Sequence, residues 1–172
     1  DDRTLIGNPN PDFMWGINNT LEYKGFDLNF FIHGVQGNDI YSFLMFELGL
    51  LSGLNNATTD ALNRWTPSNT NTDVPVANGN RARISSSRYV FDGSFIRFKN
   101  ISLGYRFPQS ILSRLGISYL RPYLSAQNLI TLTDYPGFDP EVNYRGSNTN
   151  QGLDYGGYPY VSSYTFGIQI KF

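Results

Sequence analysis

The chain has 172 residues, a formal net charge of -1 and no cysteine. There is no basic excess that would displace counterions from phosphates, which argues against a nucleic-acid partner. The lack of cysteine excludes a disulfide framework and thiolate chemistry. Tyrosine, phenylalanine and glycine are abundant at 12, 13 and 17 residues, a composition typical of a β-rich protein with aromatic girdles.

The first predicted elements are two strands joined by a tight turn. Residues near 13–23 and 26–35 alternate between apolar side chains and small or polar ones, which is the period of a strand with one apolar face. Lys24-Gly25 fits the turn of a β-hairpin. Each strand has about the ten residues that a tilted strand needs to cross a bilayer, whereas no run reaches the roughly 20 apolar residues of a membrane helix.

A long connection, residues 36–93, follows the hairpin. We expect Asn38 or Asp39 to cap a short helix that runs to about Leu51, and this helix must be covered because it is apolar on nearly every side. Residues 55–80, rich in Asn, Thr, Pro and Gly, are expected to form a loop. Such a long connection is uncommon in a compact soluble domain and normal on the outer side of a membrane barrel.

The third strand is predicted near 94–107 and changes phase in its middle. Ile101 and the alternate residues after it are apolar, but Ile96 and Phe98 lie in the opposite phase. Either a β-bulge lies near Lys99 or the first part of the strand lies above the lipid. The alternation leaves both explanations open.

The fourth strand, near 118–131, has the weakest alternation because Pro122 interrupts it. A short segment with about one helical turn at 109–114 is expected before this strand. A second long loop, residues 132–159, follows it.

The last strand, near 160–172, has the clearest pattern. Every second residue is aromatic or β-branched except Ser162, and the residues between them are small or polar. A row of exposed aromatic residues would invite aggregation in water, whereas a bilayer accepts it. A charge on this row would cost about 2–4 kcal/mol at mid-bilayer, and the row carries none.

The lengths of the connections predict on which side of the membrane each connection lies. Short turns at Lys24-Gly25 and 108–116 alternate with the long loops 36–93 and 132–159, and bacterial barrels have short periplasmic turns and long extracellular loops. About five antiparallel strands cannot close a barrel alone. We therefore predict an all-β fold in which residues 1–172 are the C-terminal segment of one larger transmembrane β-barrel domain, with the plug and the remaining barrel absent.

Several longer motifs follow one another in a fixed order along the chain. They are Ile6-Gly7-Asn8-Pro9-Asn10-Pro11-Asp12-Phe13, Tyr23-Lys24-Gly25-Phe26-Asp27-Leu28, Gln36-Gly37-Asn38-Asp39-Ile40-Tyr41, Asn63-Arg64-Trp65-Thr66-Pro67, Phe95-Ile96-Arg97-Phe98-Lys99-Asn100-Ile101-Ser102-Leu103-Gly104-Tyr105, Ser125-Ala126-Gln127-Asn128-Leu129 and Gly137-Phe138-Asp139-Pro140-Glu141. Together they resemble the C-terminal third of SusC/RagA-type TonB-dependent outer-membrane transporters.

The resemblance implies a barrel of about 22 strands with an N-terminal plug in the outer membrane of a Gram-negative cell, its C-terminus in the periplasm and its long loops extracellular. The implied partners are outer-membrane lipid, the rest of the same barrel, a SusD-like lipoprotein as a lid, and TonB through the absent N-terminal part. The implied cargo is oligosaccharides or peptides. A partial barrel held as a substrate by the barrel assembly machinery is a second context to consider.

The last strand also carries the residues that, by the same resemblance, form a β-signal for the assembly machinery. They are Tyr164, Phe166, Gly167, Ile168, Ile170 and Phe172. Recognition would use β-augmentation, in which an extended strand pairs with an exposed sheet edge. The plainer interpretation is that these residues only face lipid, and the same alternation serves both purposes.

No group of residues predicts catalysis, a bound metal or a cofactor, so we expect a non-enzyme. His33 is the sole histidine and has no partners at ligand spacing. Asp134, Asp139 and Glu141 lack the spacing of a calcium-binding loop, and we expect them to be structural carboxylates.

The second long loop is rich in aromatic residues, for which two roles are open. Tyr135, Phe138, Tyr144, Tyr155 and Tyr158 are candidates for contacts to a ligand, by stacking on sugar rings, or to a lid protein. Packing among neighbouring loops is the more ordinary role of such side chains.

A soluble β-sandwich that binds carbohydrate is the alternative function class, since it would also be rich in aromatic residues and glycine and free of cysteine. Detergent dependence separates the two hypotheses. A sandwich would stay monodisperse in plain buffer, whereas a barrel segment with outward apolar rows would aggregate.

Overall fold

The computed structural model describes residues 3–52, 56–80, 82–142 and 150–172. The chain divides into two compact units. We call residues 12–36, 94–134 and 159–172 the sheet unit, and residues 1–11, 37–93 and 135–158 the loop unit. Among the residues that the structure describes, no helix is long and apolar enough to span a membrane.

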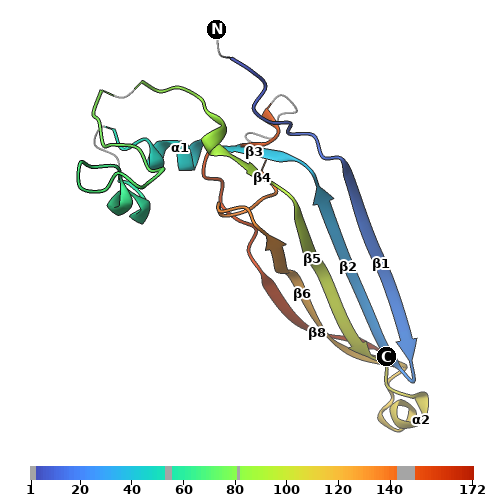
Figure 1. Ribbon diagram of the computed structural model, residues 1–172. Helices are drawn as coiled ribbons and strands as arrows, with labels where there is room; N and C mark the ends of the chain where they lie inside the picture. The colour runs from blue at the N-terminus through green and yellow to red at the C-terminus, as the bar shows by residue number, and fades with distance from the viewer. Residues whose placement is uncertain (1–2, 53–55, 81, 143–149) are drawn as a thin grey trace. The chain divides into compact units, whose positions relative to one another are not determined.

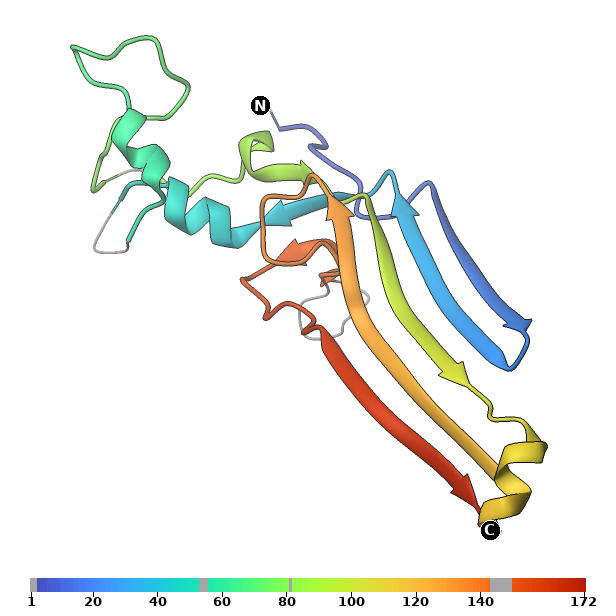
Figure 2. The same ribbon diagram turned by 90° about the horizontal axis from the view of Figure 1, so that it is seen from below.

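The sheet unit is a five-stranded antiparallel sheet with the order β1-β2-β5-β6-β8 (Figures 1 and 2). Its strands are β1 (Phe13–Tyr23), β2 (Phe26–Gln36), β5 (Phe95–Tyr105), β6 (Tyr119–Thr133) and β8 (Ser163–Lys171). The predicted class of about five antiparallel strands is confirmed. The observed strands begin or end up to three residues away from the predicted bounds, most clearly in β8.

Two short connections have the backbone that their residues favour. Lys24 and Gly25 join β1 to β2 with φ angles of 47° and 89°, and two positive φ angles are the mark of a type I′ hairpin turn. A Cβ on Gly25 would lie 2.7 Å from the carbonyl oxygen of Arg106. Between β5 and β6, α2 (Gln109–Leu112) and the 3₁₀ turn η3 (Ser113–Leu115) end at Gly116, whose φ is 66°.

The change of phase in β5 is a β-bulge at Lys99. On β2, Phe31 pairs with Asn100 and Ile32 pairs with Phe98, so Lys99 is the extra residue of the bulge. The bulge turns the earlier part of β5 over by one residue. Ile96 therefore joins the same face as the apolar residues after Asn100, and the bulge is the correct one of the two explanations.

The register separates an apolar face from a polar face, because paired residues on neighbouring strands share a face. The apolar face contains Ile17, Leu21, Leu28, Phe30, Ile32, Ile96, Phe98, Ile101, Leu103, Leu124, Ala126, Ile130, Leu132, Tyr164, Phe166, Ile168 and Ile170. Charged residues of the paired strands lie on the polar face, namely Glu22, Asp27, Arg97, Arg121 and Lys171.

The loop unit contains a small sheet that the sequence analysis did not predict. Its order is β4-β3-β7, with β3 (Asp39–Ser42) antiparallel to β4 (Val90–Asp92) and parallel to β7 (Leu153–Asp154). Strands of two to four residues are too short to show an alternation in the sequence. The described part of this unit also contains two 3₁₀ turns, η1 (Thr59–Asn63) and η2 (Ser87–Tyr89).

The helix of this unit, α1 (Phe43–Gly49), begins later than predicted. Its cap is Ser42, whose side chain accepts a hydrogen bond from the Met45 amide at 3.3 Å, so the prediction of Asn38 or Asp39 as the cap is wrong. The Asp39 carboxylate instead accepts from the Asn8 amide at 2.8 Å. The apolar helix is covered as expected, since Phe46 and Leu50 form a buried core with Tyr89.

Candidate functional site

The six residues of the predicted β-signal lie in or next to β8, at the edge of the five-stranded sheet. Its apolar row is exposed, with Phe166 at 66% and Ile168 at 54%. Gly167 lies on the polar face, where a Cβ would be 2.4 Å from the ring of Tyr123. The row therefore exposes apolar side chains on one face of the sheet, while the glycine leaves space for an aromatic ring on the other face. The remaining members of the row, Tyr164, Ile170 and Phe172, are also exposed.

An ion pair crosses three strands on the polar face. Arg121 of β6 donates from Nε to Oδ1 of Asp27 on β2 at 2.8 Å, and a second guanidinium nitrogen pairs with the other carboxylate oxygen. Both side chains are shielded, at 15% and 17% exposure. The intervening residue of β5 is Gly104, where a Cβ would run into the guanidinium. Sequence reasoning missed this pair because its members are 94 residues apart.

Near the opposite end of the polar face, a second cation lies among aromatic rings. The guanidinium of Arg97 is 5.4 Å from the ring centre of Phe95 and 5.1 Å from that of Tyr160. The ammonium of Lys99 lies 5.0 Å from the same Tyr160 ring. Cations over ring faces are attracted by the ring quadrupole, so these contacts hold Tyr160, which lies three residues before β8 begins.

The candidates for metal binding lie in ordinary structural positions. His33 is paired with Arg97 in the register and meets the ring of Phe95 edge-on at 5.3 Å. Asp139 accepts a hydrogen bond from the Glu141 amide at 2.9 Å, which is a local turn contact. Within the described ranges, no three His, Cys, Asp or Glu side chains come together as a metal site.

The aromatic residues of the second long loop that are candidates for ligand or lid contacts lie in different surroundings. Tyr135 is buried, whereas Phe138 and Tyr158 are exposed. Tyr155 stacks on Phe43, with ring centres 4.1 Å apart and planes 14° apart, and remains half-exposed. Tyr144 lies outside the described residues. Tyr135 thus has little surface to offer a ligand, and Phe138, Tyr155 and Tyr158 remain the candidates.

Tyr135 takes part in a buried polar network. Its hydroxyl donates to Oδ2 of Asp154 at 2.5 Å, and Oδ1 of Asp154 accepts from the Gly156 amide at 2.7 Å. Burial and the bond to the carboxylate raise the pKa of the Tyr135 phenol. The network holds the second long loop against β3, because Ser42 of that strand is fully buried and pairs with Asp154.

No family model matches the chain. Among known proteins, it is 52% identical to TonB-dependent receptor P3 of Formosa agariphila and 27% identical to TonB-dependent receptor SusC of Bacteroides thetaiotaomicron. Each alignment covers 99% of this chain and only 17% or 16% of the relative.

Two solved structures have a similar fold. One is the RagAB peptide importer in the closed-closed state, with a TM-score of 0.80 and 30% identity, and the other is the same importer in the open-open state, with 0.78 and 29%. In both, the match covers 94% of this chain and 17% of the compared chain. The chain thus spans about a sixth of the length of the proteins it matches.

Proposed function

We propose, from the premise that this chain belongs to the SusC/RagA-type TonB-dependent receptors, that its sheet unit is a part of the wall of an outer-membrane β-barrel. The observation that carries the proposal is the apolar face. Seventeen apolar or aromatic residues share it, the charged residues of the paired strands lie on the other face, and large side chains such as Leu124 and Ile130 are exposed.

The physical argument concerns what surrounds each face. In water, an exposed apolar surface of this extent costs free energy and favours aggregation. In a bilayer the same surface contacts acyl chains, while a polar face lines the barrel interior. The 11 residues of β2 or β5 match the roughly 9–11 residues of a tilted transmembrane strand.

Cysteine accessibility tests this arrangement, because this chain has no cysteine and any cysteine elsewhere in the full-length receptor can be replaced first. In the full-length receptor in outer-membrane vesicles, we expect Ile168→Cys to react with a lipid-soluble maleimide and to resist a charged, water-soluble one. Gln169→Cys, one residue later on the polar face of β8, should react with the water-soluble reagent. Equal labelling of both positions by the charged reagent would contradict the proposal.

The cargo and partners of the whole receptor form the finer part of the proposal. We propose import of oligosaccharides or peptides, with a SusD-like lipoprotein as the lid and TonB engaging a part outside this chain. The similarity to a structure described as a peptide importer supports a transport role. Phe138, Tyr155 and Tyr158 are the proposed contacts of the second long loop. Co-purification of a lipoprotein with the tagged receptor, and its loss on deletion of 150–158, tests the partner.

The orientation is proposed from the lengths of the connections. The turn at Lys24-Gly25 and the α2 segment would lie in the periplasm, and the loop unit would lie outside the cell. Protease added to intact cells should cut within residues 56–80 and leave the Lys24-Gly25 turn intact. Cutting at the hairpin turn alone would reverse the orientation.

The alternation of β8 supports a role in barrel assembly. Its row of apolar side chains, which includes Phe166 and Ile168, is exposed on one face. An extended strand with such a row is suited to β-augmentation by the assembly machinery, and a partial barrel would be held in the same way. Replacing Phe166 and Ile168 by serine should lower the amount of folded receptor in the outer membrane.

The alternative, a soluble β-sandwich that binds carbohydrate, requires a second sheet packed over the apolar face. Residues in the middle of that face, such as Leu103 and Leu124, are exposed. The matched proteins are named receptors and an importer, which favours a non-enzymatic function.

A further inference from the structure

The loop unit contains a reactive pair of residues, Asn78-Gly79, that the proposed wall function does not use. It is the sole Asn-Gly pair in the sequence, and both residues are exposed. The nitrogen of a glycine is the least hindered of main-chain nitrogens, because the residue has no Cβ. The side chain of Asn78 places an amide carbon one residue before this nitrogen. The pair therefore holds a nucleophile and an electrophile next to each other.

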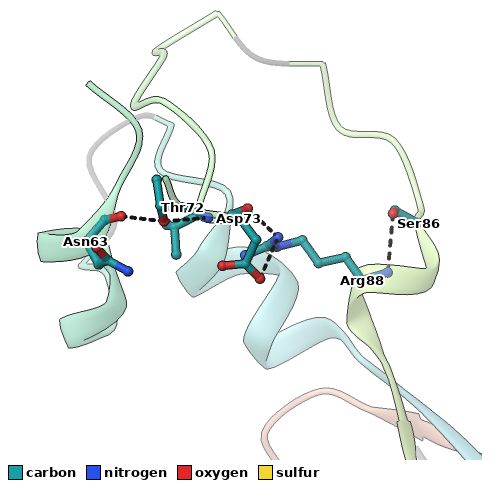
Figure 3. Close-up of polar contacts among 6 residues, drawn as sticks. Asn63, Thr72, Asp73, Ser86 and Arg88 are labelled. Carbon is teal, nitrogen blue, oxygen red and sulfur yellow. Dashed lines mark hydrogen bonds and ion pairs between the residues drawn. The ribbon is translucent and has the colours of Figure 1, made fainter. Parts of the chain in front are cut away.

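The chain is anchored on both sides of the pair. Before it, the Arg88 guanidinium donates to the carbonyl oxygen of Asp73 at 2.6 Å (Figure 3). After it, the Arg83 guanidinium donates to Oε2 of Glu47 at 3.0 Å. Between these anchors Gly79 is unhindered, since among the described residues no atom beyond its chain neighbours lies within 4 Å of the place where a Cβ would stand.

The side-chain oxygen of Asn78 is bound by a main-chain donor. The Asn80 amide donates to Oδ1 of Asn78 at 2.9 Å, which is the contact of an Asx turn. If the Gly79 nitrogen attacks Cγ of Asn78, negative charge develops on this oxygen. An N–H group already aimed at the oxygen stabilises that charge, as the donors of an oxyanion hole do.

A second Asx turn in the same unit has the contact without the nucleophile. The Asn10 amide donates to Oδ1 of Asn8 at 3.1 Å, and Asn8 is also exposed. The residue between them is Pro9, whose nitrogen carries no hydrogen and cannot become a nucleophile. Asn8 is therefore an internal reference for Asn78.

We infer that Asn78 is a site of self-modification, where the side chain loses ammonia and becomes aspartate or isoaspartate. The Gly79 nitrogen gives its proton to hydroxide and forms a bond to Cγ of Asn78. The bond from Cγ to the side-chain nitrogen breaks, and ammonia leaves with a proton from water. The cyclic succinimide then takes up one water molecule. Opening at Cγ gives aspartate, opening at the main-chain carbonyl carbon gives isoaspartate, and no oxidant or reductant takes part.

The product changes both the charge and the length of the chain at this point. It adds one negative charge to a chain whose formal net charge is -1, and isoaspartate lengthens the main chain by one carbon. The Asn78 amide donates to the carbonyl oxygen of Leu51 at 3.1 Å, two residues after the end of α1. The modification thus alters a position that joins two stretches of the loop unit, and it requires neither a bilayer nor a closed barrel.

Incubation of the purified full-length receptor, followed by peptide mapping with mass spectrometry, tests the inference. We expect conversion of Asn78, whereas Asn8 in the same digest should stay intact. Raising the pH by one unit should speed the conversion about tenfold, because the deprotonated nitrogen is the nucleophile. Isoaspartate should be found beside aspartate by labelling with isoaspartyl methyltransferase, since direct hydrolysis of the side chain would give aspartate alone.

Two glycine variants separate the nucleophile from general effects on the loop. Gly79→Ala should slow the conversion about tenfold, because a methyl group hinders the attacking nitrogen. It should keep the fold, since Gly79 has room for a Cβ and a φ outside the left-handed region. Gly157→Ala is the matched control, because Gly157 meets the same two conditions and should leave the rate at Asn78 unchanged.

A synthetic peptide of residues 75–80 shows whether the folded loop permits the reaction. The rate in the receptor should lie within about tenfold of the rate in the peptide, a factor that corresponds to about 1.4 kcal/mol in the barrier. A slower reaction in the receptor, equal conversion of Asn8, aspartate without isoaspartate, or a rate unchanged by Gly79→Ala would each overturn the inference. None of these outcomes depends on the cysteine-labelling result for β8.

Discussion

The sheet unit and the loop unit place their apolar side chains in opposite ways. In the sheet unit, Leu124 is 60% exposed, and the charged pair of Asp27 and Arg121 is shielded. In the loop unit, Phe46 and Leu50 are only 4% exposed, and charged residues such as Asp60 and Asp73 lie at the surface. The two units are made from one continuous chain.

This contrast shows that the burial of an apolar side chain has to be judged against the solvent that surrounds it. Apolar side chains are driven away from water, so the loop unit has the internal core of a water-exposed structure. A lipid bilayer supplies no such driving force against its own apolar surface, and an exposed apolar face is then stable. Substitutions that are harmless in one unit should therefore be costly in the other.

The largest expected effect is in the core of the loop unit. Phe46→Ala should lower the free energy of unfolding of this unit by about 3–5 kcal/mol, because it leaves a cavity against Leu50 and Tyr89. Hydrogen exchange of the amides of α1 in the full-length receptor would measure the loss. Leu132→Ala, at an exposed position of β6 outside the predicted β-signal, is the control and should cost clearly less. A larger cost for Leu132→Ala would contradict the contrast between the units.

The next effect is a charge on the apolar face. Leu124→Arg should lower the stability of the receptor in lipid vesicles by about 2–4 kcal/mol, since the guanidinium would lie in the hydrocarbon region. Gln127→Arg places the same group on the polar face of the same strand and should be tolerated. Unfolding by denaturant in vesicles would compare them. Equal tolerance of both would mean that this face does not contact lipid.

A smaller effect is expected at the buried phenol of the loop unit. Tyr135→Phe removes the hydroxyl that donates to Asp154, and an unsatisfied buried carboxylate oxygen should cost about 1–3 kcal/mol. Proteolysis of the 150–158 segment would report the loss.

The same residue predicts a dependence on pH. The pKa of Tyr135 is higher in the folded protein than in the unfolded chain, so its contribution to stability is complete below the ordinary tyrosine pKa of about 10 and is lost as the pH rises toward the folded value. Tyr135→Phe should remove this alkaline loss. An unchanged alkaline profile in the variant would show that another group causes it.

The smallest effect concerns the start of α1. Ser42→Ala removes the side chain that caps the helix and should cost about 1 kcal/mol, visible as faster exchange of the Met45 amide. Thr58→Ala is the control, because Thr58 precedes η1 without a side-chain cap bond. Similar changes at both sites would argue against a capping role for Ser42.

The sequence predicted the elements that have a long and regular period. Five strands of nine to 15 residues leave an alternation that no short element can imitate. The bulge at Lys99 was visible as a change of phase, and only the register of β2 against β5 could decide its cause.

The features that escaped sequence reasoning depend on distant pairing. Asp39 has the chemistry of a helix cap, but its carboxylate accepts from the Asn8 amide and its own amide donates to the Asn8 carbonyl oxygen. This partner lies 31 residues away and is not visible in the local sequence. The contact between Arg88 and the carbonyl oxygen of Asp73 likewise joins residues 15 positions apart, and nothing in the polar composition around them predicts that meeting.

The glycine beneath the Arg121 guanidinium has a consequence for how the strands find their order. Asp27 and Arg121 can join only if the strand between them lacks a side chain at the crossing point, and Gly104 of β5 meets that condition. A wrong strand in this position would leave two charges unpaired in a shielded place, which costs several kcal/mol. The ion pair thus favours the correct order of the strands in the sheet. Exchanging the two charges, Asp27→Arg with Arg121→Asp, should restore the folded yield that either single change loses.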